Sequence, residues 1–260
     1  MTPKCPPCLS VIIPIYNESQ NLHSALLGFQ CLRELGAELI LVDGGSNDGS
    51  QALLWQHRNL WDHCVVGSPG RARQMNAGAE LARSELLMFL HLDSQLSAPP
   101  PINKMSELAA MGKWSYFTLK LSSKKFPYTW IASSINWRSR ITANVTGDQV
   151  FCLSKKQFLD LGGYQDIPLM EDVALCDRLK HQARGVRLST KVETSSRRWQ
   201  KNGILKTIVM MWWFRFLYRC GVSPNSLAKR YYPNVNFDVY AAPSYQSLES
   251  IIQQATAEAS

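Results

Sequence analysis

Two arginines, Arg71 and Arg73, are the first candidates for chemistry in this sequence, in the run Gly-Arg-Ala-Arg-Gln-Met-Asn-Ala-Gly at residues 70–78. The run opens a predicted helix, and the free N–H groups and partial positive charge of a helix start favour phosphate. Two cations in a first turn oppose the helix dipole unless an anion compensates for them. The run therefore predicts a phosphate-binding site.

Polar residues also follow the first two predicted strands. The segment Pro-Ile-Tyr-Asn-Glu at 14–18 combines a rigid turn, an aromatic ring and hydrogen-bonding groups, which suit a nucleotide base at a sheet edge. The same pattern also occurs in ordinary turns. Asp43 ends the second strand, and Asp48 precedes Gly49 and Ser50, where it can cap the next helix. These residues are candidates for nucleotide binding, with capping alone as the alternative for Asp48.

The elements that must position these residues alternate between strand and helix. Short β-branched apolar runs predict strands at residues 9–15, 38–42, 64–66 and 85–90, and helical patterns lie between them at 20–35, up to about 57, and at 71–82. Gly36 is expected to end the first helix. This alternation predicts an α/β fold with a doubly wound, Rossmann-like, mostly parallel sheet, whose ligand lies at the carboxyl ends of the strands.

The second half of the chain has a different pattern, which begins after the three prolines at 99–101. Strands are expected at 114–121 and 150–153, and helices at 128–141, 170–182 and 204–218, which makes a mixed α+β half. Spaced prolines and polar residues predict a loose tail from about residue 233. We therefore expect an N-terminal tail at 1–8, a single domain at 9–231 and a C-terminal tail at 232–260.

The charge of the chain indicates an anionic partner. The sequence has 28 Lys and Arg against 20 Asp and Glu, a formal net charge of +8. Nucleic acid, an acidic membrane surface and a phosphorylated small molecule all fit such a charge. The basic residues concentrate at 184–201 and at Arg215, Arg219, Lys229 and Arg230.

The 7 cysteines indicate a reducing environment rather than a disulfide framework. Most are scattered through apolar segments, which predicts buried thiols at Cys31, Cys64, Cys152, Cys176 and Cys220. The pair Cys5 and Cys8 lacks the second pair of a structural zinc site. Prolines interrupt the N-terminus before any signal-peptide pattern forms, so the expected compartment is cytoplasmic.

These motifs, in this order, resemble those of the family 2 glycosyltransferases of the GT-A fold, from residue 9 to about 231. The runs at 70–78 and 168–173 (Pro-Leu-Met-Glu-Asp-Val) look most like a small bacterial subgroup of single-domain enzymes related to arsenosugar-biosynthesis-associated glycosyltransferases. The resemblance implies inverting transfer of a sugar from a nucleoside-diphosphate donor, with a lean to UDP, onto an acceptor hydroxyl. It makes about 9–98 the donor half, about 102–200 the acceptor half and about 201–231 a C-terminal helical part.

The resemblance also assigns residues to the donor. The family carboxylate that binds the uracil N–H matches Asp43, Arg71 takes a larger share of the diphosphate or nucleoside than Arg73, and Gly78 allows close backbone approach. Arg198 and Trp199 match an Arg/Trp pair near the diphosphate, with an exposed basic loop as the alternative. The residues expected to contact the donor are Pro14, Tyr16, Asn17, Glu18, Asp43, Arg71, Arg73, Asn76 and Arg198.

The family usually has an acidic D-x-D motif, which holds Mn²⁺ or Mg²⁺ against the donor phosphates, after the fourth strand. This chain has His91-Leu92-Asp93 there, so a histidine replaces the first acid. A hard cation takes oxygen ligands and keeps water, so Asp93 and two phosphate oxygens suffice. Asp93 and His91 are the expected metal ligands, and a core histidine bonded to backbone is the alternative for His91.

The base and the acceptor site are assigned in the same way. Glu171 and Asp172 match the family motif whose aspartate takes the acceptor proton, so Asp172 is the expected base and Glu171 the fallback. A helix dipole would keep a carboxylate there ionised. Asp148, Gln149 and Trp199 are expected to bind the acceptor, and the alternative for Asp148 is a turn that only shapes the next strand.

The helix at 204–219 is too short and too charged to span a bilayer, although its Trp and Arg side chains suit an interfacial helix on anionic lipid. Packing on the domain's own core is the rival interpretation, and no nucleic acid partner is expected. Two other functions fit part of the sequence. A nucleotidyltransferase would share the donor half but needs a Gly-rich loop after the first strand, and a non-catalytic binding or membrane-docking module would have lost its metal site at His91.

Overall fold

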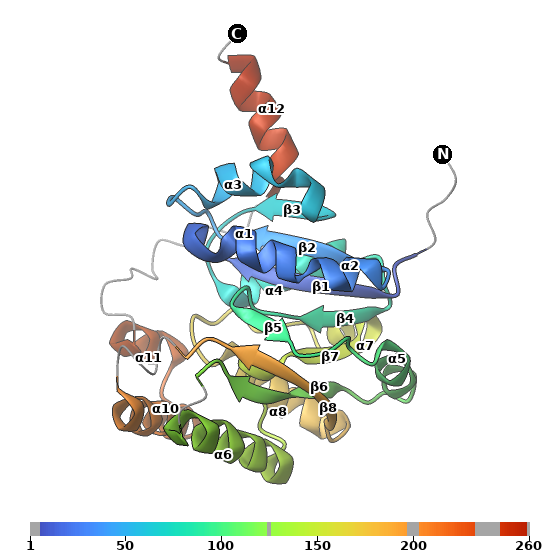
Figure 1. The fold of residues 1–260 in the computed structure, drawn as a ribbon. Helices are drawn as coiled ribbons and strands as arrows, with labels where there is room; N and C mark the ends of the chain where they lie inside the picture. Colours follow the sequence, from blue (N-terminus) through green and yellow to red (C-terminus); the bar gives the residue numbers. More distant parts are fainter. Residues whose placement is uncertain (1–5, 124–125, 197–202, 232–244, 259–260) are drawn as a thin grey trace.

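The computed structural model of this chain describes residues 6–123, 126–196, 203–231 and 245–258 (Figure 1). Its centre is a nine-stranded sheet of order β5-β8-β6-β7-β4-β1-β2-β3-β9. The strands are β1 (Leu9–Ile15), β2 (Ala37–Asp43), β3 (His63–Val66), β4 (Leu86–Phe89), β5 (Ser94–Leu96), β6 (Ser115–Leu121), β7 (Phe151–Ser154), β8 (Val186–Thr194) and β9 (Gln246–Ser247).

Helices cover the sheet and continue beyond one end of it (Figure 1). They are α1 (Ser19–Gly28), α2 (Gln30–Glu34), α3 (Ser50–Gln56), α4 (Arg71–Leu81), α5 (Ile102–Ala110), α6 (Phe126–Thr142), α7 (Lys155–Asp160), α8 (Glu171–Gln182), α10 (Ile204–Arg219), α11 (Pro224–Tyr231) and α12 (Leu248–Glu258). In the described ranges, none of these helices has the length and apolarity to cross a membrane.

The first half has the predicted doubly wound arrangement. Strands β4, β1, β2 and β3 are parallel neighbours, and β1 and β2 are buried almost throughout, as their β-branched apolar runs predict. The predicted helix at 20–35 is two helices instead, because Phe29 turns inward to the core between α1 and α2. Gly36 has the left-handed φ of +86° expected after a helix end.

Close packing of α4 on the sheet explains the last glycine of the 70–78 run. A Cβ on Gly78 would lie 2.5 Å from Cγ2 of Ile12 and 3.2 Å from Cγ2 of Val42. Any larger residue there would push α4 away from β1 and β2. This close approach holds the start of α4 against the carboxyl ends of those strands.

The second half is mixed, as predicted. It contains β8, a strand that the sequence pattern did not indicate. β7 runs antiparallel to both β4 and β6, and β8 lies parallel to β6. β8 alternates exposed and buried residues and occupies much of the basic segment at 184–201, so its apolar signal is weak. Its end is held to β5 through the buried hydroxyls of Ser94 and Thr194, 2.6 Å apart.

The expected loose tail from residue 232 is wrong for residues 246–258. β9 pairs antiparallel with β3, and α12 follows directly. Leu248 is buried in the main core and Ile252 packs against it, while Glu249 forms an ion pair with Arg58 at 2.7 Å. Leu248 and Ile252 were too few apolar positions to outweigh the polar composition of this segment in the sequence.

The cysteines follow the prediction in part. Cys64, Cys152 and Cys176 are buried free thiols, whereas Cys31 and Cys220 are exposed. Cys31 lies on the outer side of α2, and Cys220 follows the end of α10, where no core covers it.

Candidate active site

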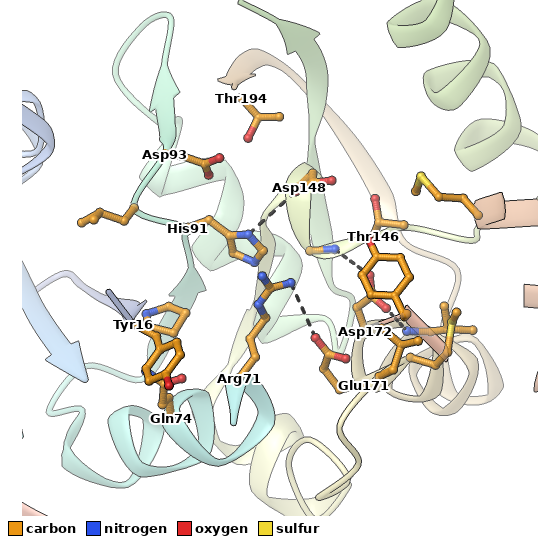
Figure 2. A pocket seen from close by; sticks show the side chains of 18 of the residues that line it. Tyr16, Arg71, Gln74, His91, Asp93, Thr146, Asp148, Glu171, Asp172 and Thr194 are labelled. Atoms are coloured by element: carbon orange, nitrogen blue, oxygen red, sulfur yellow. Dashed lines mark hydrogen bonds and ion pairs between the residues drawn. The ribbon is translucent and has the colours of Figure 1, made fainter. Parts of the chain in front are cut away.

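A cavity of about 380 Å³ lies at the carboxyl ends of the central strands (Figure 2). Its walls come from the segment after β1, the start of α4, the loop after β4, the turn before β7, the start of α8 and the inner side of α10. Asp93 and Asp172, the expected metal ligand and base, both line this cavity. The described structure therefore brings together the two residues on which the predicted chemistry depends.

Asp93 is exposed at the wall formed by the loop after β4. The neighbouring residues on both sides are buried, because Leu92 packs in the core and Ser94 bonds to Thr194. These anchors fix the loop while the carboxylate of Asp93 faces the open space. A side chain so placed can bind a ligand from solvent without unfolding its surroundings.

Asp172 is held by backbone donors at the start of α8. Its Oδ2 accepts a hydrogen bond from the Gly147 N–H at 3.0 Å, and its Oδ1 accepts one from the Val173 N–H at 2.7 Å. Met170, just before the helix, has a left-handed φ of +72°, which is costly for a residue with a side chain. These features fix the orientation of the Asp172 side chain at the cavity wall.

Glu171 is more deeply buried than its neighbour, with 7% of its surface exposed. Its Oε1 lies 3.8 Å from Nη1 of Arg71. Burial and the nearby charge of Asp172 raise the pKa of Glu171 to about 7, and Arg71 offsets part of this shift. A carboxyl group with this pKa exchanges protons close to neutral pH.

Glu171→Gln is expected to stabilise the protein above pH 7 by on the order of 2 kcal/mol, since a pKa raised from 4.5 to about 7 makes the ionised form costly in the folded state. Between pH 4.5 and 7 the folded protein binds the proton more tightly than the unfolded chain, so the stability of the natural protein falls as pH rises through this window. Urea denaturation at pH 5 and pH 8 measures the effect.

The expected gain for Glu171→Gln at pH 8 should disappear at pH 5. Glu107→Gln is a matched control, because Glu107 is exposed and forms a surface ion pair with Lys104. A Glu171→Gln protein with equal or lower stability at pH 8 would contradict the assignment.

His91 lies between the Asp93 side and the acceptor side of the cavity (Figure 2). Its Nδ1 is 3.8 Å from Oδ1 of Asp148, and a Cβ added to Gly147 would come within 2.9 Å of its Nε2. The described residues contain no group of three or more His, Cys, Asp or Glu side chains placed to hold a metal ion. His91 therefore lies at the cavity wall against the 146–148 turn, and its role as a metal ligand stays a prediction.

Several residues expected to bind the nucleotide are used by the fold instead. Asp43 is fully buried, and its carboxylate accepts hydrogen bonds from Gly45, Ser46 and Gln51 within the turn after β2. Asn17 accepts from the Asn47 N–H and does not line the cavity. The predicted direct contact of these two side chains with the donor is therefore not supported by the structure.

Asp48 has the capping role given as its alternative. Its carboxylate accepts hydrogen bonds from the Ser19 N–H at the start of α1 and from the Ser50 N–H at the start of α3. Pro14, Tyr16 and Glu18, by contrast, line the cavity as predicted, and Tyr16 is exposed.

The residues of the 70–78 run also differ in their contacts, since some line the cavity and others bond within the fold. Arg71 lines the cavity, whereas Arg73 forms an ion pair with Asp166 at 2.7 Å and lies outside the lining. The side-chain Nδ2 of Asn76 donates to the Tyr164 carbonyl, and its Oδ1 accepts from the Tyr164 N–H. Asn76 thus joins α4 to the 163–164 turn. The structure therefore gives Arg73 and Asn76 contacts within the fold, and donor contact by either stays a prediction.

On the acceptor side, Asp148 lines the cavity but Gln149 does not. The Gln149 side chain is fully buried and accepts a hydrogen bond from Ser139 of α6 at 2.6 Å. Its predicted acceptor contact is wrong, because it instead anchors the turn before β7. Arg198 and Trp199 lie outside the described residues.

Gln74 and Arg215 are among the cavity residues that were not predicted to form the site. Gln74 is buried, and its Nε2 donates to the carbonyls of Ile15 and Val42, each at 2.7 Å. It thus joins α4 to the ends of β1 and β2, and its place in the 70–78 run was the signal for it. Arg215 lines the cavity from α10. The sequence indicated it only as one of several basic residues in the second half of the chain.

Comparison with known proteins finds a partial family match. Residues 10–117 match the sequence pattern described as glycosyl transferase family 2. The chain is similar to that family over these residues, which are 108 of its 260. The matched segment contains β1 to β4 and ends in β6, so the likeness covers the first half of the fold and little of the second.

Two curated transferases are similar to part of the chain. An undecaprenyl-phosphate 4-deoxy-4-formamido-L-arabinose transferase of Pseudomonas paraeruginosa is 36% identical over 113 residues, which are 40% of this chain and 33% of the relative. The glycosyltransferase AglE of Haloferax volcanii is 31% identical over 93 residues, 34% of this chain and 31% of the relative. The alignments thus cover about a third of each relative's length.

Solved structures confirm the GT-A glycosyltransferase fold. S. aureus TarS 1-349 in complex with UDP gives a TM-score of 0.52 at 16% sequence identity, covering 72% of this chain and 61% of that protein. The mannosyltransferase PcManGT from Pyrobaculum calidifontis, in complex with GDP-Man and Mn²⁺, gives 0.50 at 17% identity, covering 73% and 57%. At such identities the likeness establishes the α/β fold and leaves the reaction to the site.

Proposed function

We propose that this chain is an inverting, metal-assisted glycosyltransferase that moves a sugar from a nucleoside-diphosphate donor, UDP in preference to other nucleotides, onto an acceptor hydroxyl. The observation that supports the proposal is the common cavity of Asp93 and Asp172, with Arg71 between the two sides (Figure 2). The two carboxylates come from separate halves of the chain, and a single reaction requires both in one place.

The donor diphosphate fits the wall made by Arg71 and Asp93. The guanidinium of Arg71 is half-exposed in the first turn of α4, where it can bind phosphate oxygens. Asp93 supplies one carboxylate, which suits a Mn²⁺ or Mg²⁺ ion that takes its other ligands from phosphate and water. Such an ion, when bound, stabilises the negative charge on the departing diphosphate. The complex of the mannosyltransferase PcManGT with GDP-Man and Mn²⁺, which is similar in fold, supports this expectation.

We assign Asp172 as the base that takes the proton from the acceptor hydroxyl. An inverting displacement needs a base on the face of the sugar opposite the leaving group. Asp172 is oriented by its backbone hydrogen bonds and faces the cavity from the other half of the fold. Asp148, half-exposed beside it, is placed to bind an acceptor hydroxyl. Glu171, with its raised pKa, is the fallback base.

Thermal unfolding with UDP, GDP, Mg²⁺ and Mn²⁺ tests the donor assignment. A ligand that binds only the folded protein at 100 times its Kd adds about 2.7 kcal/mol of stability. We expect the melting temperature to rise with UDP and metal together by more than with GDP and metal or with either component alone. A non-catalytic module would show no metal-dependent rise, and a larger rise with GDP would overturn the nucleotide preference.

We also propose peripheral contact with the cytoplasmic surface of an anionic membrane, through α6 and α10. Trp130 and Trp137 of α6 and Trp212 and Trp213 of α10 are each more than half exposed. The two helices are neighbours, because Met211 of α10 packs against the cluster around Ile131 of α6. Tryptophan and arginine together favour the interface of an anionic bilayer.

Replacement of both Trp212 and Trp213 by Ala is expected to weaken binding to phosphatidylcholine vesicles that contain phosphatidylglycerol by roughly tenfold, which corresponds to about 1.4 kcal/mol. Vesicle sedimentation measures the change. Trp55→Ala is the matched control, because Trp55 is partly exposed on α3, away from α6 and α10. Equal binding by the double variant and the natural protein would contradict the proposed contact.

A further inference from the structure

A smaller cavity of about 60 Å³ adjoins the candidate active site, and the two share Thr146, Val173 and Arg215 in their walls. Arg138 of α6 and Arg219 of α10 line it as well. Among the residues that the structure describes, no carboxylate lines this space. We call the space bounded by Arg138, Arg215 and Arg219 the arginine cavity. Its positive walls come from two helices that are far apart in the sequence.

Arg138 has an incomplete set of hydrogen bonds. Its Nε is buried and has no partner within the described part of the chain, while its Nη2 donates to the Asn144 carbonyl at a long 3.4 Å. A buried donor without a partner destabilises the folded state. Burial, and next the charge of Arg215, lower the pKa of Arg138 to about 10. The position is therefore unfavourable for a guanidinium unless an acceptor joins it.

Arg215 supplies a second unsatisfied cation. No hydrogen bond or ion pair joins its guanidinium to any other residue in the described ranges. Arg219 differs, because it reaches Asp177 at 3.4 Å. Two guanidinium groups lining one small space repel each other, and an oxyanion between them converts this repulsion into two attractive contacts.

The carboxylates close to this region are already engaged. Asp177 pairs with Lys180 at 2.7 Å, and Asp172 accepts hydrogen bonds from Gly147 and Val173. Neither of them lines the arginine cavity. Within the described residues, therefore, no carboxylate competes with an external anion for the arginine cavity.

We propose that the arginine cavity is a subsite for a phosphate group carried by the acceptor. The inference rests on the proposed function, since it assigns a chemical class to the acceptor of that reaction. The volume of the cavity suits one tetrahedral oxyanion rather than a nucleoside. Thr146 and Val173, which separate the two spaces, flank the Asp172 side of the active site. A phosphate bound by Arg138 and Arg215 holds the rest of the acceptor against that side.

Isothermal titration with inorganic phosphate tests the subsite, in the presence of Mg²⁺ and saturating UDP so that the donor diphosphate position is filled. We expect Arg215→Gln and Arg138→Lys each to bind phosphate at least tenfold more weakly than the natural protein. Arg138→Lys keeps the charge but loses the fork of donors. Arg187→Gln is the control, because Arg187 is exposed on β8 and lines neither cavity.

Three results would overturn the proposal. The first is an unchanged phosphate affinity in both cavity variants, and the second is an equal loss of affinity in Arg187→Gln. The third is complete displacement of phosphate by UDP, because that result would assign the arginines to donor binding. A titration without UDP reports on the cavity even for a protein that binds no nucleotide, so failure of the proposed function is distinguishable. Unfolding temperatures of the unliganded variants separate a lost site from a lost fold.

Vesicles distinguish the source of the phosphate. Phosphatidylcholine vesicles with phosphatidic acid present a lipid phosphate, and inorganic phosphate serves as the competitor. If Arg215→Gln weakens vesicle binding more than Arg187→Gln does, and phosphate competes, the acceptor is a phosphorylated lipid. If phosphate binds in the titration while the vesicles bind both variants alike, the acceptor is a soluble phosphorylated molecule. Both outcomes support the subsite.

Discussion

Asp172→Asn is expected to lower the turnover number for sugar transfer by about 10²–10⁴-fold, the range typical of a lost general base. The affinity for UDP should stay within about twofold, because a base acts in the transition state rather than in donor binding. Steady-state kinetics with a UDP-sugar, together with titration of UDP, measures the two quantities separately. The expected pattern is a loss in kcat without a loss in donor binding.

Glu171→Gln is the matched comparison for this prediction, since both carboxylates stand in the first turn of α8. A loss of activity that is larger in Glu171→Gln than in Asp172→Asn would make Glu171 the base. Asparagine can accept only one of the two hydrogen bonds that Gly147 and Val173 donate to Asp172, so the unfolding temperature of the variant must be measured as well. A large loss of UDP affinity would assign Asp172 to the donor.

Asp93→Ala is expected to abolish the effect of Mg²⁺ or Mn²⁺ on UDP binding and to lower transfer by about 100-fold or more. A metal at a leaving diphosphate contributes several kcal/mol to the transition state, and about 1.4 kcal/mol corresponds to tenfold in rate. Asp93 is exposed at the cavity wall, so its removal leaves the core unchanged. UDP titrations with and without metal, and metal-dependent hydrolysis of the donor, measure the effect.

Asp160→Ala controls for the loss of one negative charge, because Asp160 is exposed and pairs with Lys156 away from the cavity. If Asp93→Ala hydrolysed the donor in Mn²⁺ at the rate of the natural protein, the metal assignment would be wrong. If both variants lost activity equally, the effect would come from net charge rather than from the site.

The fold was predictable because the first half is locally consistent. The β-branched runs of β1 and β2 are buried as such runs should be, and Gly36 and Gly78 occupy positions that need a glycine. β8 was not predictable because only alternate residues are buried, and its pairing with β6 and β5 is set by tertiary contacts. For such strands, packing outweighs local propensity.

The candidate site was predictable to the level of segments rather than side chains. The sequence placed Asp43 correctly at a strand end, and Arg73 and Asn76 in the helix that follows β3, but each is bonded within the protein. A polar residue at a turn can cap the chain or bind a ligand, and both uses need the same residue types at the same positions. Only the direction of the side chain distinguishes them, and direction depends on distant partners such as Asp166 and Tyr164.

The pairing of β9 with β3 has a consequence for biosynthesis. β3 lies at the border of the first-half sheet, and the strand that covers it is made near the other terminus. During translation the backbone groups on that side of β3 stay unprotected until residues 246–258 emerge, although the rest of the α/β half can already have condensed. Such an open border invites pairing between nascent chains. Nascent chains from which residues 246–258 have not yet emerged therefore expose this side of β3 to such pairing.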